Sequence, residues 1–180
     1  MAIESIQLRD KARRIYEVAR LRHALAFSIP ALFIGLSVAL VVRDISMPLV
    51  FGLLLYLTSV VLLWWGRGPG RSVLPGVTYG LLPLAGGIIA KFHHHACMGF
   101  SCYSTCMLYC VSGGLLAGLL VARLAMKSQT PVVIFLSAAA TALLTGTIGG
   151  SCVGGHGIIG MALGIGLGAI PLALRPAPKR

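Results

Sequence analysis

Charged residues are scarce in this chain, and acidic residues are scarcer still. Asp, Glu, Lys and Arg make up 11% of the 180 residues, and only four of them are acidic. Soluble domains carry about 25% charged residues, so this composition argues against a water-soluble fold. Hydrophobic residues account for 57% of the chain and the mean hydropathy is +0.92. These values indicate a membrane protein without a separate soluble domain.

Ionisable residues are also missing from the interior of the apolar stretches. No Asp, Glu or Lys lies inside any of them, and no Arg lies away from their ends. Such residues mark proton relays and ion pathways in membranes, so their absence argues against a proton-coupled transporter. Signatures of enzymes are lacking too, because the chain has no nucleophile elbow and no phosphate-binding loop with Gly-Lys-Ser/Thr. The sequence therefore predicts a protein that is not an enzyme.

Six apolar stretches are long enough to cross a bilayer, which takes about 20 residues as a helix. They cover residues 22–42, 47–65, 73–90, 107–126, 131–150 and 158–174. The connections between them are short, which makes neighbouring helices antiparallel. We therefore expect an all-α polytopic membrane protein with six transmembrane helices in three hairpins. Residues 1–22 form a short amphipathic helix before them, residues 23–175 form the transmembrane domain, and residues 176–180 form a tail.

The basic residues predict how this bundle is oriented. Thirteen of the 15 Lys and Arg residues fall on one side of the predicted bundle, and only Arg43 and Lys91 fall on the other. The thirteen are Arg9, Lys11, Arg13, Arg14, Arg20, Arg22, Arg67, Arg71, Arg123, Lys127, Arg175, Lys179 and Arg180. Because cytoplasmic loops are rich in Lys and Arg, both termini are predicted to be cytoplasmic, in a bacterial inner membrane. The net charge of +11 then needs no nucleic acid to explain it.

The N-terminal segment is the predicted contact with the cytoplasm. Two roles stay open for its alternating apolar and basic residues: an anchor lying on anionic lipid headgroups, or a docking helix for a soluble protein. Asp10 and Arg14 are spaced for an i,i+4 ion pair. The residues predicted to contact a partner are Arg9, Arg13, Arg14, Tyr16 and Arg20.

Small residues recur at helical spacing in the second half of the chain. Three sets share it: Gly114 and Gly118; Gly146 and Gly150; and Gly160, Gly164 and Gly168. Glycines at this spacing let helix backbones approach closely in lipid. We expect a tightly packed bundle of the last three spans, with a glycine-lined pore as the alternative.

Cysteine and histidine gather in two connections on the side opposite the basic residues. The candidate metal ligands are His93, His94, His95, Cys97, Cys102, Cys106, Cys110, Cys152 and His156. Cys102, Cys106 and Cys110 follow one another at intervals of four, so they share a face if the fourth helix begins early. Thiolate and imidazole ligands suit zinc or copper(I). The sequence therefore predicts a metal-binding or redox-responsive site.

These cysteines and histidines are also compatible with structural roles. An extracytoplasmic compartment is oxidising, so pairs of the cysteines would form structural disulfides, and the total of five is odd. Cys110 lies deep enough to serve as an ordinary packing residue. His93 to His95 would serve equally as hydrated interface residues. The spacing lacks any Cys-x-x-Cys pair, so it does not identify the metal.

The layout of the basic tail Arg9–Arg22, six spans and outward cysteines resembles that of six-span bacterial anti-sigma factors. This resemblance of layout implies a sensor of metal or oxidative stress whose cytoplasmic segment holds a sigma factor. The alternatives are a small transporter or channel for a soft metal ion and an accessory subunit of a membrane complex. The sequence also leaves open a homo-oligomer.

Overall fold

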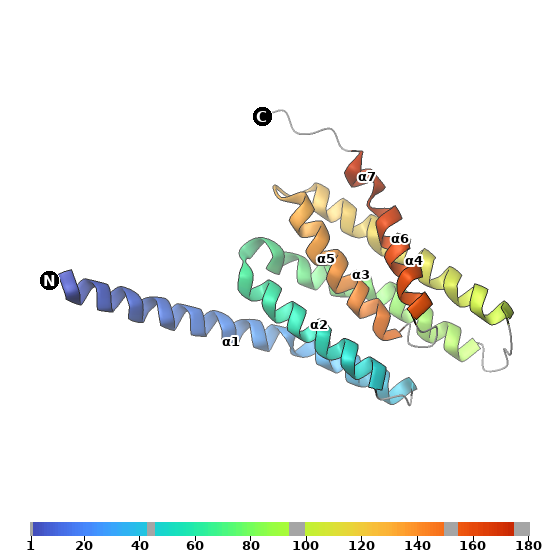
Figure 1. The fold of residues 1–180 in the computed structure, drawn as a ribbon, viewed down its shortest axis with the longest axis horizontal. Helices are drawn as coiled ribbons and strands as arrows, with labels where there is room; N and C mark the ends of the chain where they lie inside the picture. Colours follow the sequence, from blue (N-terminus) through green and yellow to red (C-terminus); the bar gives the residue numbers. More distant parts are fainter. Residues whose placement is uncertain (1, 43–45, 94–99, 150–154, 175–180) are drawn as a thin grey trace.

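The computed structural model describes residues 2–42, 46–93, 100–149 and 155–174, which are almost entirely helical. The helices are α1 (Ala2–Val42), α2 (Ser46–Trp65), α3 (Arg67–His93), α4 (Phe100–Met126), α5 (Pro131–Gly149), α6 (Gly155–Gly168) and α7 (Ile170–Ala173) (Figure 1). Pro131 begins α5, where its missing N–H costs no intrahelical hydrogen bond. The prediction of an all-α fold is confirmed.

Five of these helices are long and apolar enough to cross a membrane. The apolar parts are Lys11–Val41, Ser46–Trp65, Pro69–Ile89, Met107–Met126 and Pro131–Gly149. They overlap the first five predicted spans, although the first begins at Lys11 and not at residue 22, and the chain is a multi-pass membrane protein by this length and composition. Most large apolar side chains outside the core are exposed, as expected where helices face lipid.

The sixth predicted span, residues 158–174, differs from the structure. The apolar helix there, Gly157–Ala173, is shorter than the other five and is divided into α6 and α7 at Ala169. The amide of Ala169 bonds the carbonyl of Gly166 in a tighter turn, and Pro171 has no N–H to continue the α-helical ladder. The missing N–H of Pro171 thus explains why the helix is interrupted at Ala169.

The first helix also differs from the expectation of a short N-terminal helix before the first span. Helix α1 is continuous over 41 residues and passes residue 22 without a break. Its first half projects away from the bundle, while its second half packs along α2 (Figure 1). Residues 11–19 are exposed on every side of the helix.

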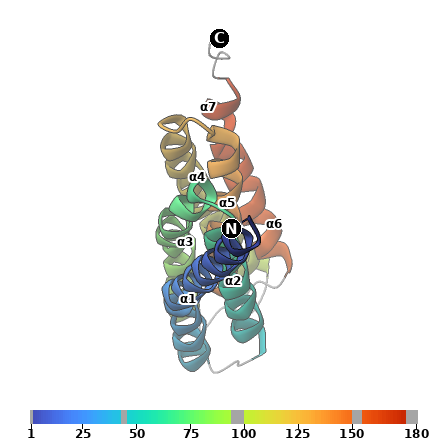
Figure 2. The same cartoon turned by 90° about the vertical axis from the view of Figure 1, so that its left-hand side faces the viewer.

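Successive long helices run antiparallel, so the bundle has two distinct ends (Figure 1). We call the end where α3 finishes and α4 and α6 begin the cysteine end. The opposite end, with Gly66 and residues 127–130, is the basic end. Helix α5 contacts α1, α2, α3, α4 and α6; Figure 2 shows α1 pointing toward the viewer in front of the bundle.

Glycine packing between α4 and α6 confirms the prediction of close helix contact. A Cβ atom on Gly114 would lie 2.6 Å from the carbonyl oxygen of Met161, and one on Gly118 would lie 2.6 Å from that of Ile165. Gly164 and Gly168 of α6 face the backbone of α4 in the same way. The space beside these four glycines is filled by the facing backbone, so they line no pore.

Two further glycine contacts were not predicted from the sequence. Gly80 of α3 lies against α5, where its Cβ would stand 2.8 Å from the carbonyl oxygen of Ala142. Gly35 and Gly52 bring α1 and α2 together, with the Cα of Gly52 3.0 Å from a Cβ on Gly35. The core is accordingly built largely from small residues, with one cluster of buried hydrophobic side chains: Ala31, Val38, Leu55, Leu84 and Ile148.

Candidate functional site

The end of α3 and the beginnings of α4 and α6 place several of the predicted ligand positions at the cysteine end. His93 ends α3, Cys102 and Cys106 lie in the first two turns of α4, and His156 is the second residue of α6. His94, His95, Cys97 and Cys152 lie outside the described residues. Of the predicted ligands only Cys110 has a described side chain. Among the described residues there is no group of three or more His, Cys, Asp or Glu able to hold a metal ion, so the metal site stays a prediction.

Helix α4 starts at Phe100, seven residues before the predicted span. Cys102, Cys106 and Cys110 are therefore all helical positions, and their intervals of four place them along one stripe. The sequence predicted this stripe on condition that α4 begins early, and that condition is met. The spacing of the three cysteines does not by itself show which neighbouring helix the stripe faces.

The packing at Cys110 identifies the neighbour of this stripe. Cys110 is buried, with 5% of its surface exposed. Its Cβ atom lies 3.8 Å from the position that a Cβ on Gly160 of α6 would take. The Cγ atom of Met107 lies 3.8 Å from the same Cβ position, and the Cγ2 atom of Val111 lies nearer, at 3.3 Å. The part of the stripe at Cys110 thus lies on the α4–α6 interface.

Helices α4 and α6 run parallel, because the contacts of Gly114 with Met161 and of Gly118 with Ile165 advance together along both helices. One turn from Cys110 towards the cysteine end, α4 carries Cys106. One turn from Gly160 in the same direction, α6 carries His156. Parallel helices in close contact keep their register over one turn, so Cys106 and His156 occupy the same level of the interface.

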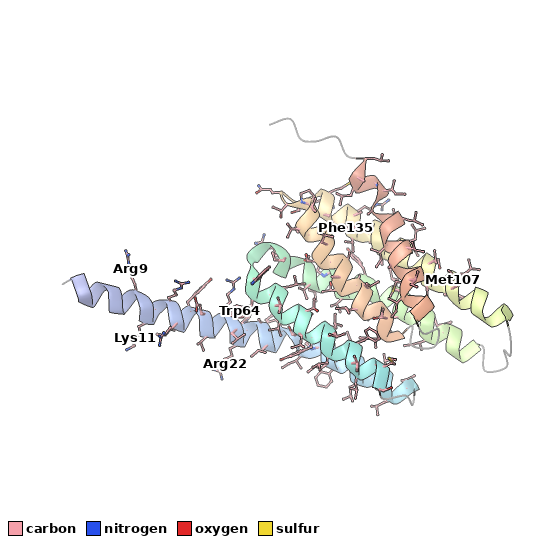
Figure 3. The ribbon with its side chains drawn as sticks, viewed as in Figure 1. Arg9, Lys11, Arg22, Trp64, Met107 and Phe135 are labelled. Carbon is pink, nitrogen blue, oxygen red and sulfur yellow. The ribbon has the colours of Figure 1, made fainter. Side chains whose placement is uncertain are left out.

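At the opposite end, the predicted partner-binding residues lie on the projecting half of α1. Arg9, Arg13, Arg14 and Tyr16 are exposed, and Arg20 is half-buried. Figure 3 shows Arg9 and Lys11 on the part of α1 that lies beyond the bundle. The structure therefore presents these side chains together on one straight helix.

The ion pair in this segment differs from the predicted one. The Nε atom of Arg13 donates to the Oε1 atom of Glu17 at 3.0 Å, and both side chains are more than half exposed. This i,i+4 pair favours the helix by about 0.3–0.5 kcal/mol. The side chain of Asp10, predicted to pair with Arg14, lies outside the described side chains.

A groove of about 630 Å³ lies where the projecting half of α1 leaves the bundle. Tyr16, Ala19, Arg20 and His23 of α1 line it together with Trp65 and Gly66. The sequence did not identify His23 and Trp65 as members of this site. The interval of seven from Tyr16 to His23 is the signal for one helix face, whereas the approach of Trp65 depends on how α1 packs on α2. The groove offers an aromatic wall beside a guanidinium group.

Buried hydroxyl groups lie inside the bundle, mainly on α5. Thr141 donates to the carbonyls of Ser137 and Ala138, Thr145 to that of Thr141, and Thr147 to that of Leu144. These bonds satisfy the hydroxyl protons within α5 itself. They stabilise the helix interior and leave those protons engaged with backbone.

Comparison of the chain with protein-family models, with curated proteins and with solved structures finds no match. Function is therefore inferred from the residues of this chain.

Proposed function

We propose that this protein is a non-enzymatic membrane sensor or regulator. In this proposal a Cys/His site at the cysteine end binds zinc or copper(I), or reacts with an oxidant, outside the cytoplasm. The basic half of α1 docks a soluble protein on the cytoplasmic side. The chain crosses a bacterial inner membrane six times, with α6 and α7 together as the sixth crossing, and both termini are cytoplasmic.

The observation that carries the proposal is the continuity of α1. One uninterrupted helix joins the exposed basic segment to the part that packs on α2. A change in the tilt of α1 within the bundle would therefore move Arg13, Tyr16 and Arg20 together. A flexible linker near residue 22 would have separated the two halves.

Contacts between helices connect the cysteine end to α1, so that a structural change at one could alter the other. Helices α4 and α6 contact α5, and α5 contacts α1 and α2. A metal ion held by Cys106 and His156 would fix the spacing of α4 and α6 at their first turns, and its binding would release thiol protons, since thiolate is the ligand. Closely packed interfaces shift between discrete arrangements instead of deforming smoothly, which would pass the change to α5.

Cys102 and Cys106 are the proposed thiolate ligands, with His156 as the imidazole ligand. His93, His94, His95, Cys97 and Cys152 complete the set of candidates. Cys110 is buried against α6, so we assign it a packing role. The resemblance of layout to six-span anti-sigma factors suggests a sigma factor as the soluble partner.

The transport alternative gains no support from the described interior. The hydroxyls of Thr141 and Thr145 bond to their own helix, and the glycines of α4 and α6 face backbone. A path for a soft metal ion needs sulfur or imidazole ligands along its length. Below Cys110, the described part of α4 and α6 has no cysteine or histidine, and its sulfur is limited to the thioethers of Met126 and Met161.

The docking half of the proposal is tested by deleting residues 2–20. The full-length protein, tagged at its C-terminus and purified in detergent, is expected to retain a soluble protein that the deletion loses. Val41→Ala is the matched control, since Val41 lies on the bundle half of the same helix and is 53% exposed. Retention of every partner by the deletion variant would refute a docking role for α1.

The site half is tested separately by metal content and thiol counting. Protein purified after growth with zinc or copper is expected to carry bound metal, which Cys102→Ser with Cys106→Ser removes. Ser112→Ala, at an exposed position of the same helix, should leave it unchanged. Protection of these thiols from alkylation with no metal present would instead indicate a disulfide.

A further inference from the structure

A second pocket lies at the basic end of the bundle and shares no lining residue with the groove beside α1. It has a volume of about 660 Å³ and lies between the start of α3 and the turn from α4 to α5. Its lining residues are Arg71, Leu124, Lys127, Ser128, Gln129, Thr130 and Ile134. Residues more than 50 positions apart in the chain thus form one pocket.

The pocket carries two positive charges that nearby acids do not balance. Arg71 and Lys127 come from different segments, and both are exposed. The only acids of the chain are Glu4, Asp10, Glu17 and Asp44, so none occurs in α3 to α7. The ion pair found among the described residues joins Arg13 and Glu17 instead. An anionic ligand would therefore meet no carboxylate from the lining.

Neutral donors accompany the two cations. The amide of Thr130 donates to the Oγ atom of Ser128 at 3.2 Å, which holds the turn in a defined shape. Helix α5 begins directly after Thr130 with Pro131, which has no N–H, so the first N–H groups of the helix are those of Val132 and Val133, at the positive end of its dipole. Such a turn favours a phosphate group beside Arg71 and Lys127.

Two apolar side chains distinguish this pocket from a site for a free anion. Leu124 of α4 and Ile134 of α5 line it below the turn, and both belong to helices that are apolar enough to span a membrane. Trp64 and Trp65 end α2 at the same end of the bundle (Figure 3), and tryptophan prefers the membrane interface. The pocket thus joins a basic rim at headgroup level to an apolar wall.

We propose that this pocket binds the phosphate headgroup of an anionic phospholipid. Arg71 and Lys127 hold the phosphate oxygens, Ser128 and Thr130 offer hydroxyl groups, and Leu124 and Ile134 contact the upper part of an acyl chain. Basic pockets between helices at a membrane surface recognise such headgroups. The inference is independent of what occupies the cysteine end or docks on α1.

The experiment titrates the purified full-length protein in detergent with phosphatidylglycerol and counts bound lipids by native mass spectrometry. Parallel arms use phosphatidylcholine, which has no net charge, and inorganic phosphate, which has no acyl chain. The test variant is Arg71→Gln with Lys127→Gln. The matched control is Arg123→Gln, which removes one positive charge from an exposed position of α4 outside the pocket lining and is compared with the single variant Arg71→Gln.

We expect phosphatidylglycerol to bind the wild type and the control equally, and the test variant about thirtyfold more weakly. That factor corresponds to about 1 kcal/mol for each basic residue near an anionic headgroup, at 1.4 kcal/mol per factor of ten. Arg71→Gln alone, at an exposed position, should weaken binding about fivefold. This single change keeps the test valid if the double variant misfolds.

Three outcomes would overturn the proposal. One is equal retention of phosphatidylcholine and phosphatidylglycerol by the wild type. Another is a loss of binding in Arg123→Gln as large as in Arg71→Gln, which would show that only total charge matters. The third is displacement of phosphatidylglycerol by an equal concentration of inorganic phosphate, which would indicate a site for the free anion.

Discussion

A methyl group on Gly118 of α4 would stand 2.6 Å from the carbonyl oxygen of Ile165 in α6. Distances under 3.0 Å for a Cβ require one backbone to move, and here the neighbour is backbone on a parallel helix. The α4–α6 interface therefore depends on glycine at this position. It also accompanies the contact of Cys110 with Gly160 of α6.

Gly118→Val is expected to destabilise the protein by about 1–3 kcal/mol, the usual cost of overfilling a packed site. Gly166 of α6 provides the control, because nothing lies within 4 Å of its Cβ position. Gly166→Ala should leave stability unchanged or raise it by up to about 1 kcal/mol. Thermal unfolding in detergent, followed by circular dichroism, measures both. Equal effects of the two substitutions would contradict the packing described here.

The two tryptophans offer a measure of depth in the membrane. Trp64 and Trp65 are the only tryptophans of the chain, and Trp65 is 85% exposed at the end of α2. We expect lipids brominated near the headgroup to quench their fluorescence more strongly than lipids brominated near the chain end. Stronger quenching from the bilayer centre would mean that α2 ends inside the hydrocarbon and that the basic end is misplaced.

Ser72 and Ser137 join α3 and α5 by a hydrogen bond between side chains. Their hydroxyl oxygens are 2.5 Å apart and buried, and each also contacts a carbonyl of its own helix, at Pro69 and Val133. A double-mutant cycle with Ser72→Ala and Ser137→Ala should give a coupling of about 0.6 kcal/mol and no more than about 1.7 kcal/mol, the range for such bonds in membrane proteins. Unfolding in detergent supplies the four free energies, with Thr78→Ala, an exposed position on α3, as a control. Strictly additive effects of the two substitutions would show that this hydrogen bond does not stabilise the contact between α3 and α5.

Hydropathy predicted most of the fold because a span needs a long apolar run and little else. The five long helices of the structure follow these runs. The break at Ala169 was missed because Gly166, Ala169 and Pro171 are all apolar or small, so hydropathy continues across them. The join between the N-terminal segment and the first span was also missed, since a change from basic to apolar residues at Arg22 alters the surroundings of a helix without ending it.

The site was harder to predict, because helix periodicity fixes a face and not its neighbour. The intervals of Cys102, Cys106 and Cys110 predicted their shared stripe. That Cys110 faces Gly160 follows from a packing contact between residues 50 positions apart in the chain, which no local pattern contains. Trp65 lies in the groove beside Tyr16 because α2 packs on α1, which is again a contact between helices that no local pattern contains.

The contact at Cys110 predicts a cross-link. The Cβ of Cys110 lies 3.8 Å from the Cβ position of Gly160, which is the mean Cβ separation in disulfides. In a chain whose other cysteines are changed to serine, Gly160→Cys should form a disulfide with Cys110 when copper phenanthroline is added as oxidant. Two thiols then lose two protons and two electrons to the oxidant, and peptide mass mapping detects the loss of two hydrogens. Gly166→Cys, whose Cβ position has no neighbour within 4 Å, should stay reduced.

The same reasoning extends one turn towards the cysteine end, where Cys106 and His156 are level. With Cys106 as the remaining native cysteine, His156→Cys should cross-link to it under the same oxidant and with the same loss of mass. Ile159→Cys is the control, because that position of α6 is 57% exposed. A cross-link at residue 159 in place of residue 156 would mean that α6 is rotated at its first turn. Since a shared metal ion needs both ligands on one level of the interface, that rotation would also separate Cys106 from His156 in the proposed site.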